Sequence, residues 1–375
     1  MNILAVDPYY TGSHKAFLDG LQKNSKHTIL PVTLTNTDRK WRMHGYSIDL
    51  TQLTQSVGEP VDLLLASSMT NLATYVALTN PRFANVPKIM YMHENQITQP
   101  VPAGESKDWT LSYFNYLSLL TADVLVFNTH FHYNECIEAL PRFLEHFGKG
   151  KHLNTIDEIK SKSRVLYPGL ELKAFDRTPN LHRPKQEFVI VWNQRWTFDR
   201  DPAKFFRILN RLDDIGLDFE MILAGDSQHD KPEAFEQAWR RYGNRIKHFG
   251  YVDDFQTYGK LLHQGDVVVS TSDYEFFCTP ILEAIYCGCH PLLPNRLHYP
   301  ELIPERLHKP LLHAPILYDS EDDLFSIMKN LLSGKTKCLP RSTLQSVNRH
   351  LDWFEQIKAF DELFESVAEE HSVPE

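Results

Sequence analysis

The sequence predicts an α/β protein with two doubly wound domains, each built on a parallel sheet. Three observations support this prediction: the chain has 375 residues, short apolar segments recur along it with helix-length gaps between them, and the pattern restarts after a polar segment at 176–184. A chain of this length exceeds one typical core and suffices for two. Strands that alternate with helices form parallel βαβ units, whose strands are buried on both faces and therefore apolar throughout.

The expected strands are rich in valine, isoleucine and leucine. In the first half of the chain they span Ile3–Val6, Thr28–Leu34, Leu63–Ala66, Lys88–Met92, Val124–Phe127 and Arg164–Tyr167. In the second half they span Phe188–Trp192, Phe219–Ala224, Ile246–Phe249, Val267–Ser270 and His290–Leu293. Between the fifth and sixth strands, the polar segment Leu140–Ser163 is predicted to be mostly helical.

The proline-marked segment at 176–184 is predicted to separate the two domains. We therefore expect a Rossmann-like domain over residues 1–178 and a second one over residues 179–345, facing each other across a cleft. Apolar side chains recur with helical spacing beyond Leu351, which predicts a helical tail over residues 346–375 that packs back across the domains. Ligands of such sheets bind at the carboxyl ends of the strands.

The composition is that of an ordinary soluble protein, with 42% apolar and 23% charged residues. A net charge of −9 argues against a protein that coats itself in nucleic acid, although one local basic patch is compatible with it. We expect a cytoplasmic location, because no apolar run is long enough for a membrane helix and no signal peptide is recognisable. Five cysteines without framework spacing fit a reducing compartment, and Cys287 and Cys289 are expected to be small buried thiols rather than half of a metal site.

The strongest local signal is a pair of glutamates, Glu275 and Glu283, that follows the tenth expected strand. Thr279 and Pro280 fit the N-cap and the first turn of a helix, so Glu275 lies in the preceding loop and Glu283 one turn into the helix. A helix N-terminus binds a diphosphate, and we expect the amides at 277–279 to point toward the cleft. Carboxylates beside such a site suit the hydroxyls of a sugar and a ribose. The alternative is that Glu275 is merely solvated and Glu283 favours the helix start.

Two arginines, Arg195 and Arg200, follow the first strand of the second domain. Cations five residues apart at the end of a strand can converge on one diphosphate, to which arginine offers paired hydrogen bonds. We therefore expect both side chains to face the solvent of the cleft. Asp199 and Asp201 mimic an acidic triplet that binds manganese. We expect no metal, because two arginines can neutralise the phosphates on their own.

Two segments of the first domain lie where expected strands end. Gly12, Ser13 and His14 follow the first strand, and a glycine in the first βα turn allows a ligand to approach the backbone. His93 and Asn95 follow the fourth strand. A histidine at this edge is equally often a satisfied core residue, so the residues alone leave both alternatives open for His93.

The spacing of Glu275 and Glu283, followed by Ala284 and Gly288, resembles the E-x7-E signature of retaining glycosyltransferases with the GT-B fold. In that family the first glutamate contacts the donor sugar and the second contacts the ribose of the nucleotide. An arginine and a second cation clamp the diphosphate, and a histidine of the first domain lies near the reacting sugar. The usual Gly-Phe-Gly after the first glutamate is Phe276-Phe277-Cys278 here, which is a departure in the loop.

Further segments resemble the tRNA-queuosine mannosyltransferases, over nearly the whole chain from Asp7 to about Leu302. These segments are Gly12–Lys15, Ser67-Ser68, His93–Gln96, Phe127-Asn128, Trp192-Asn193 and Tyr299–Leu302. The resemblance implies a first domain on the acceptor side and a second domain that binds the nucleotide-sugar. It implies an enzyme that transfers mannose from GDP-mannose to the cyclopentenediol of queuosine in tRNA-Asp with retention of configuration, without a metal or other cofactor. We expect no membrane contact, and no protein partner can be inferred.

The resemblance also implies roles for individual residues. The expected catalytic residues are His93, Arg195, Arg200 and Glu275. The expected donor-binding residues are Gly12, Ser13, His14, Asn95, Asn193, Gly225, Phe277, Cys278, Thr279 and Glu283.

The acceptor leaves two alternatives open: a retaining GT-B enzyme with a polysaccharide or lipid acceptor, and a non-catalytic tRNA- or nucleotide-binding module. A tRNA acceptor requires a local basic surface and a place for one extruded nucleotide. The segment 39–44, expected to be a loop, offers four potential cations and the ring of Trp41. More cations come from Lys149, Lys151, Lys160, Lys162 and Arg164.

Overall fold

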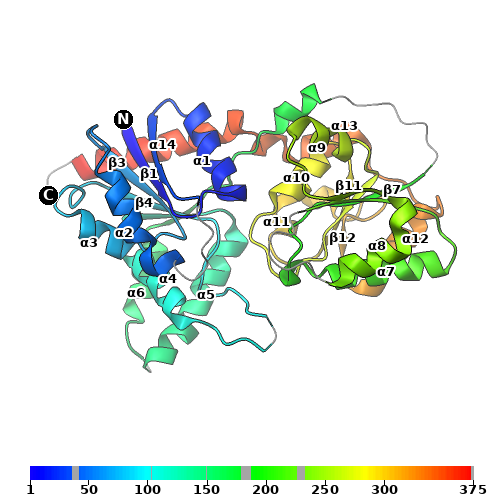
Figure 1. The fold of residues 1–375 in the computed structure, drawn as a ribbon, viewed down its shortest axis with the longest axis horizontal. Helices are drawn as coiled ribbons and strands as arrows, with labels where there is room; N and C mark the ends of the chain where they lie inside the picture. Colours follow the sequence, from blue (N-terminus) through cyan, green and yellow to red (C-terminus); the bar gives the residue numbers. More distant parts are fainter. Residues whose placement is uncertain (36–41, 103, 149, 179–186, 226–232, 373–375) are drawn as a thin grey trace. The chain divides into compact units, whose positions relative to one another are not determined.

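Two parallel sheets of six strands form the framework of the protein (Figure 1). The structure is a computed structural model that describes residues 1–35, 42–102, 104–148, 150–178, 187–225 and 233–372. The chain forms two compact units, one from Met1–Leu170 with Trp353–Glu375 and one from Glu171–Asp352, and each unit contains one sheet. The predicted α/β class with two doubly wound sheets is therefore confirmed.

The first sheet has the strand order β2-β1-β3-β4-β5-β6, and all its pairings are parallel. Its strands are β1 (Asn2–Asp7), β2 (Thr28–Thr33), β3 (Leu63–Ser67), β4 (Lys88–Met92), β5 (Val124–Phe127) and β6 (Ser163–Val165). The strand order reverses between β1 and β3, so the carboxyl ends of these two strands flank a switch point. Doubly wound sheets bind ligands at such a point.

Helices cover both faces of this sheet because consecutive strand residues point to opposite faces. They are α1 (Gly12–Asn24), α2 (Arg42–Thr54), α3 (Leu72–Thr79), α4 (Trp109–Thr121), α5 (His130–Phe147), α6 (Asn154–Ser161) and α14 (Trp353–Ser372). Leu4 and Val6 pack with the core that α2 to α6 supply, whereas Ile3 and Ala5 pack with α1 and α14. The predicted helical excursion between the fifth and sixth strands is present as the C-terminal part of α5 and as α6.

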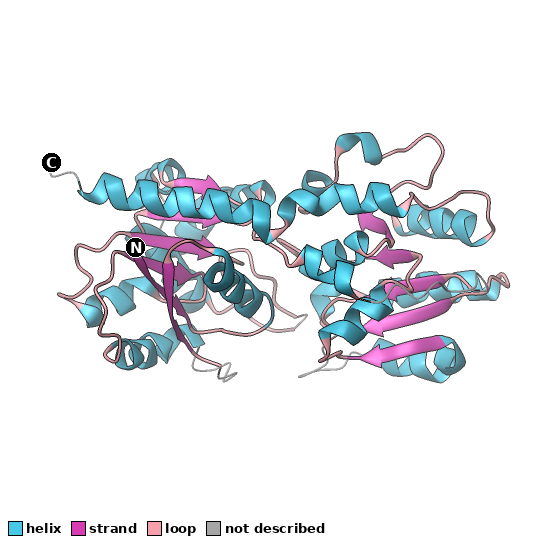
Figure 2. Cartoon of the chain, turned by 90° about the horizontal axis from the view of Figure 1, so that it is seen from above, coloured by secondary structure: helices cyan, strands magenta, loops and turns pink. Residues whose placement is uncertain are grey.

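The C-terminal helix α14 groups with the first unit and packs on one face of its sheet. Figure 2 shows this helix ending at the label C, beside the strands of the first unit. The ring of Trp353 lies so close to Gly20 and Gly169 that a Cβ added at either glycine would lie 2.1 Å from it. Trp353 of α14 therefore packs closely against α1, and positions 20 and 169 accept only glycine because any larger residue would overlap the Trp353 ring.

The second sheet has the strand order β12-β11-β10-β7-β8-β9, again with parallel pairings throughout. Its strands are β7 (Val189–Trp192), β8 (Glu220–Ala224), β9 (Ile246–Gly250), β10 (Val267–Val269), β11 (His290–Pro294) and β12 (Leu317–Tyr318). The switch point lies between β7 and β10. The sequence did not predict β12, because two residues are too few to show a strand period.

Three helices of the second unit begin at capping residues: the side chains of Asp201, Asp254 and Ser320 each accept a hydrogen bond from a backbone amide of the helix that follows. The α-helices are α7 (Pro202–Asp214), α8 (Glu233–Tyr242), α9 (Phe255–Leu262), α10 (Thr279–Tyr286), α11 (Tyr299–Leu302), α12 (Glu321–Leu332) and α13 (Arg341–Asn348). Short 3₁₀ turns are η1 (Leu172–Arg177), η2 (Phe198–Arg200), η3 (Gly243–Arg245), η4 (Glu305–Leu307) and η5 (Arg349–Leu351).

The segment that follows Leu170 packs with the second unit, eight residues or so before the boundary that we placed after Thr178. In η1, Asp176 accepts a hydrogen bond from the Tyr286 hydroxyl at 3.1 Å, and Thr178 Oγ1 lies 2.8 Å from His263 Nε2. These contacts explain why η1 belongs with α9 and α10. The rest of the predicted linker, 179–186, lies outside the described residues.

Two smaller expectations differ from the structure. The segment 39–44 was expected to be a loop, but Arg42, Met43 and His44 open helix α2; Arg39 to Trp41 lie outside the described residues. Cys278, rather than Thr279, occupies the N-cap position of α10. Within the described part of the chain, every helix is too short or too polar to cross a membrane.

Candidate active site

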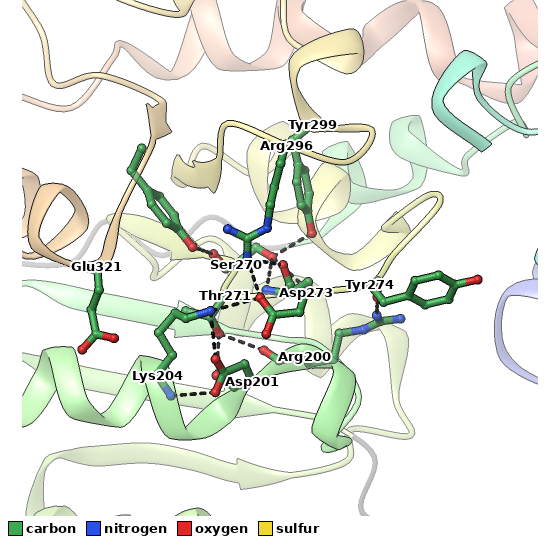
Figure 3. Close-up of polar contacts among 12 residues, drawn as sticks. Arg200, Asp201, Lys204, Ser270, Thr271, Asp273, Tyr274, Arg296, Tyr299 and Glu321 are labelled. Atoms are coloured by element: carbon green, nitrogen blue, oxygen red, sulfur yellow. Dashed lines mark hydrogen bonds and ion pairs between the residues drawn. The ribbon is translucent and has the colours of Figure 1, made fainter. Parts of the chain in front are cut away.

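The carboxyl ends of β7 and β10 bring together the two arginines and the first glutamate of the second unit. Arg195 follows β7 and Arg200 ends η2, while Glu275 lies in the loop between β10 and α10. Thr271, just after β10, donates a hydrogen bond through Oγ1 to the backbone oxygens of Arg200 and Asp201, both at 2.9 Å (Figure 3). This hydroxyl fixes the η2 turn at the switch point of the sheet.

Arg200 lies buried in a network of carboxylates, with only 3% of the residue exposed. Its Nη2 is 2.6 Å from Glu275 Oε2, its Nη1 is 2.9 Å from Asp199 Oδ2, and it also donates to the backbone oxygen of Tyr274. Burial opposes the charge, but the two carboxylates outweigh burial and raise the pKa of Arg200. We expected both arginines to face solvent. For Arg200 this was wrong, because folding places its guanidinium between two carboxylates.

Arg195 is exposed, as expected, and acts on the start of α10. Burial and the Glu275 carboxylate raise the pKa of the Cys278 thiol, while the charges of Arg200 and Arg195 oppose that rise. Both arginines therefore place positive potential at the N-terminus of α10, where the helix dipole is also positive. An anionic group is the ligand that this potential favours.

The acidic residues around Arg200 are already paired with cations of the second unit. Asp199 pairs with Arg200, and Asp201 caps α7 by accepting from the Lys204 amide at 3.0 Å. Lys204 Nζ lies 2.8 Å from Asp201 Oδ2 and 3.1 Å from Asp273 Oδ1 (Figure 3). The aspartates of the predicted triplet thus have structural partners, which gives the manganese alternative no support from their geometry.

Glu283 lies on α10, is partly exposed, and accepts a hydrogen bond from the Tyr258 hydroxyl at 2.9 Å. Asn193 donates through Nδ2 to the same hydroxyl at 3.1 Å and to the Pro280 oxygen at 2.7 Å. Asn193 Oδ1 is buried, and the described residues offer it no hydrogen-bond partner. Burial raises the pKa of Glu283 to about 7, although the Tyr258 hydrogen bond acts in the opposite direction.

We expect the two glutamates to affect different steps. Glu275→Gln should mainly lower kcat, and Glu283→Gln should mainly weaken binding of the nucleoside diphosphate. Because the raised pKa makes Glu283 neutral at low pH, wild-type affinity for the nucleotide should fall as the pH drops from 8 to 6, and Glu283→Gln should remove this dependence. Calorimetric titration with the nucleotide at several pH values, beside steady-state kinetics, measures both effects. Equal losses of nucleotide affinity in both variants would contradict the division.

The other predicted donor residues have varied surroundings. Phe277 is partly exposed, and Thr279 opens α10 beside the buried Cys278. Gly225 follows β8, where an added Cβ would lie 2.2 Å from the backbone oxygen of Gln194. Close packing within the second unit is therefore enough to explain why position 225 is a glycine, without a contact to a ligand. Cys287 and Cys289 are both buried, as expected.

In the first unit, the carboxyl ends of β1 and β4 hold a chain of three ionisable side chains. His14, on the first turn of α1, lies with Nδ1 2.8 Å from Asp7 Oδ2 and Nε2 3.2 Å from Glu94 Oε2. Ser68 donates to the other oxygen of Glu94 at 2.9 Å. The structure thus brings His14 into contact with the segment that carries His93. The sequence did not predict this contact.

The charges of Asp7, His14 and Glu94 stabilise one another. Burial alone would lower the pKa of His14, but the carboxylates of Asp7 and Glu94 raise it to about 10. Burial alone would raise the pKa of Glu94, but the His14 charge and the hydrogen bonds from His14 and Ser68 lower it to about 2. At neutral pH, His14 is therefore an imidazolium held between two carboxylates.

His93 stacks on His14, with ring centroids 4.0 Å apart. Burial and the neighbouring His14 charge hold the pKa of His93 well below its usual value, so its ring is neutral. Asp7, His14 and His93 each bring one potential metal-ligand atom within 4.8 Å of the others. Both nitrogens of His14 already have carboxylate partners, so the hydrogen-bonded imidazolium accounts for the arrangement of this cluster.

The remaining residues of the first unit differ in accessibility. Gly12 has φ +50°, and an added Cβ would meet open space, so the backbone is accessible there. Ser13 is exposed. Asn95 is buried and accepts from the Thr98 amide at 2.8 Å through Oδ1, so one of its polar atoms maintains the local turn.

Sequence reasoning missed Asp7, Ser68, Glu94 and Tyr258 as members of these networks. Asp7 ends the first strand, and Glu94 lies in the same four-residue segment as His93 and Asn95. Their positions at the carboxyl ends of β1 and β4 were a usable signal, because the carboxyl ends of parallel strands meet at one edge of the sheet. Tyr258 gave no such signal, since it lies within α9.

Comparisons with known proteins place the chain among glycosyltransferases. Residues 2–170 match a family described as "tRNA-queuosine alpha-mannosyltransferase N-terminal", and residues 175–315 match "Glycosyl transferases group 1". A tRNA-queuosine alpha-mannosyltransferase from Drosophila melanogaster is 31% identical over 312 residues, which cover 81% of this chain and 82% of the relative.

Solved structures of low identity share the fold. A sucrose-phosphate synthase from Thermosynechococcus elongatus has a TM-score of 0.73 at 13% identity, covering 98% of each chain. The catalytic domain of starch synthase IV from Arabidopsis thaliana, bound to ADP and acarbose, has a TM-score of 0.70 at 10% identity, covering 98% of this chain and 99% of that one. The predicted GT-B fold is confirmed by these similarities together with the two sheets.

Proposed function

Because the chain belongs to the tRNA-queuosine alpha-mannosyltransferase family and is a glycosyltransferase, we propose that it transfers mannose from GDP-mannose to the cyclopentenediol of queuosine in tRNA-Asp, with retention of configuration. The observation that carries this proposal is the match of residues 2–170, which contain nearly all of the first unit, to the queuosine family specifically. The match of the second unit to a general glycosyltransferase family supports the type of reaction. The proposal for the acceptor depends on the match of the first unit.

The second unit supplies the groups that a nucleotide-sugar needs. Arg195 and the N-terminus of α10 hold the diphosphate, and the buried Arg200 adds its charge and fixes Glu275. Glu275 orients the sugar and Glu283 accepts from the ribose hydroxyls. The departing diphosphate takes the proton of the attacking hydroxyl on the same face of the sugar, so catalysis consists of positioning and stabilisation of the leaving charge. His93, being neutral, contributes a hydrogen bond near the sugar.

The basic surface for tRNA is only partly described. Arg39 to Trp41 and Lys149 lie outside the described residues, and His44 lies 3.8 Å from Asp108. On α6, Lys160 pairs with Asp157 at 3.5 Å and Lys162 with Glu158 at 3.3 Å, so the acids of this helix offset its lysines. Lys151 and Arg164 remain as exposed cations beside it. Support for a tRNA acceptor therefore comes from the family rather than from charge.

The acceptor is tested with tRNA-Asp that carries either queuosine or guanosine at the same position. We expect mannose transfer from GDP-mannose to the first and none to the second, because the guanosine tRNA lacks the diol. Mass spectrometry of the digested nucleosides measures the product, and the anomeric configuration tests retention. Equal transfer to both tRNAs, or transfer to a glycan or lipid alone, would refute the acceptor. A protein that binds tRNA and hydrolyses no nucleotide-sugar would support the non-catalytic alternative.

Metal removal tests the proposed absence of a metal. We expect full activity in excess EDTA, because Arg195 and the start of α10 neutralise the diphosphate, and because Asp199 and Asp201 are paired with Arg200 and Lys204. Initial rates before and after dialysis against EDTA measure this. Loss of activity that manganese restores would contradict the prediction and make the two aspartates candidate ligands.

A further inference from the structure

Glu94 is fixed through both oxygens of its carboxylate and still reaches the surface. Oε1 accepts from Ser68 Oγ at 2.9 Å, and Oε2 lies 3.2 Å from His14 Nε2. The side chain keeps 29% of its surface exposed, whereas the His14 side chain keeps 2%. Ser68 follows β3 and His14 opens α1, so the carboxylate lies at the switch point of the first sheet.

The partners of Glu94 leave it free to bind hydroxyl groups. An ionised carboxylate has about four acceptor positions, of which Ser68 and His14 use two. With one imidazolium between two carboxylates, the Asp7–His14–Glu94 chain keeps one net negative charge, and the neutral His93 beside it adds none. Such a site repels a diphosphate and favours hydroxyl donors. Because its pKa is held near 2, Glu94 acts as a hydrogen-bond acceptor rather than as a base.

We propose that Glu94 binds the vicinal diol of the acceptor by accepting a hydrogen bond from the hydroxyl that does not attack the sugar, and that His14 and Asp7 position its carboxylate. The donor has its own hydroxyl acceptors, Glu275 and Glu283, in the second unit. On the acceptor side, the proposed reaction supplies the hydroxyls of the cyclopentenediol. This inference rests on the proposed function, since that function defines the acceptor.

The test compares Glu94→Gln, which removes the negative charge at nearly constant size, with Glu138→Gln. Glu138 is an exposed residue of α5 and lies in the same unit, so it controls for the loss of one charge. Glu94→Gln should lower kcat/KM for queuosine tRNA by about 10- to 100-fold, as expected for loss of hydrogen bonds to a charged group. Its Kd for GDP should stay within about twofold of wild type, and Glu138→Gln should match wild type in both measurements.

A second arm replaces a hydroxyl of the acceptor instead of the side chain. With wild-type protein, a tRNA whose cyclopentene lacks the hydroxyl that does not receive the sugar should be used about tenfold or more less efficiently than the diol. With Glu94→Gln, the two tRNAs should be used nearly equally, because the pair then no longer interacts. If Glu94→Gln unfolds, the wild-type comparison decides, since equal use of the diol and the deoxy acceptor would overturn the proposal.

The outcomes separate this inference from the proposed function. Wild-type protein that modifies no queuosine tRNA would refute both. Transfer that is unchanged in Glu94→Gln, or a deoxy penalty that persists in Glu94→Gln, would overturn the role of Glu94 alone. A metal ion at one equivalent in the purified protein, detected by mass spectrometry and lost in Asp7→Asn, would also overturn it, because His14 would then be a metal ligand instead of an imidazolium bridge.

Discussion

Alanine in place of Arg195 is expected to lower the rate of sugar transfer by about 100-fold or more at saturating donor. The guanidinium is exposed beside the start of α10, and its charge reaches Cys278 at the helix N-cap. A donor aimed at a departing charge contributes about this much to an enzymatic rate. Because the side chain is exposed, the free energy of unfolding should change little.

The matched control is Arg240→Ala, which removes an exposed arginine from α8 in the same unit. Single-turnover rates with each variant, beside their denaturation midpoints, separate a catalytic loss from a structural one. Near wild-type turnover of Arg195→Ala at saturating donor would show that the diphosphate does not depend on this residue.

Alanine in place of Arg200 is expected to abolish most activity and also to destabilise the protein, by about 3 kcal/mol or more. The side chains of Glu275 and Asp199 are only 14% and 10% exposed beside Arg200, so its removal leaves two largely buried carboxylates without this partner. An uncompensated buried charge costs more than the ion pair itself contributes. An exposed arginine could be replaced with little change in the free energy of unfolding, whereas Arg200 should not tolerate replacement because its side chain is buried.

A double variant distinguishes lost charge balance from lost packing. Arg200→Met with Glu275→Gln removes one cation and one anion of similar size, so it should be less destabilised than Arg200→Ala while remaining inactive. Chemical denaturation measures the stabilities. An unchanged midpoint for Arg200→Ala would mean that the network contributes nothing to folding.

The secondary structure was predictable because its signals are local. Every strand expected from an apolar run is present, and the parallel arrangement follows from helices that alternate with strands. The strand that the sequence did not predict, β12, has two residues, which are too few to show an alternating pattern. The division at Leu170 was not predictable from composition, because η1 is assigned to the second unit by its contacts with Tyr286 and His263.

The candidate site was predictable as a set of positions. Glu275, Arg195 and His93 follow strands at an edge where ligands bind, Glu283 lies one turn into α10, and the spacing of the two glutamates could be read from the sequence. The hydrogen-bond and ion-pair partners of these residues could not be predicted from the sequence. His14 and Glu94 are 80 residues apart, and Arg200 and Glu275 are 75 apart, so only the strand order makes them neighbours.

The sequence by itself therefore determined the fold class, the strands, and the family to which the motifs belong. Only the tertiary structure decided which ionisable groups are charged and where they point. It buried Arg200 between two carboxylates, held Glu94 ionised beside an imidazolium, and raised the pKa of Glu283 to about 7. The physical reason is that hydrophobic periodicity is carried by near neighbours in the chain, whereas burial and charge pairing depend on residues that meet only when strands distant in sequence lie side by side.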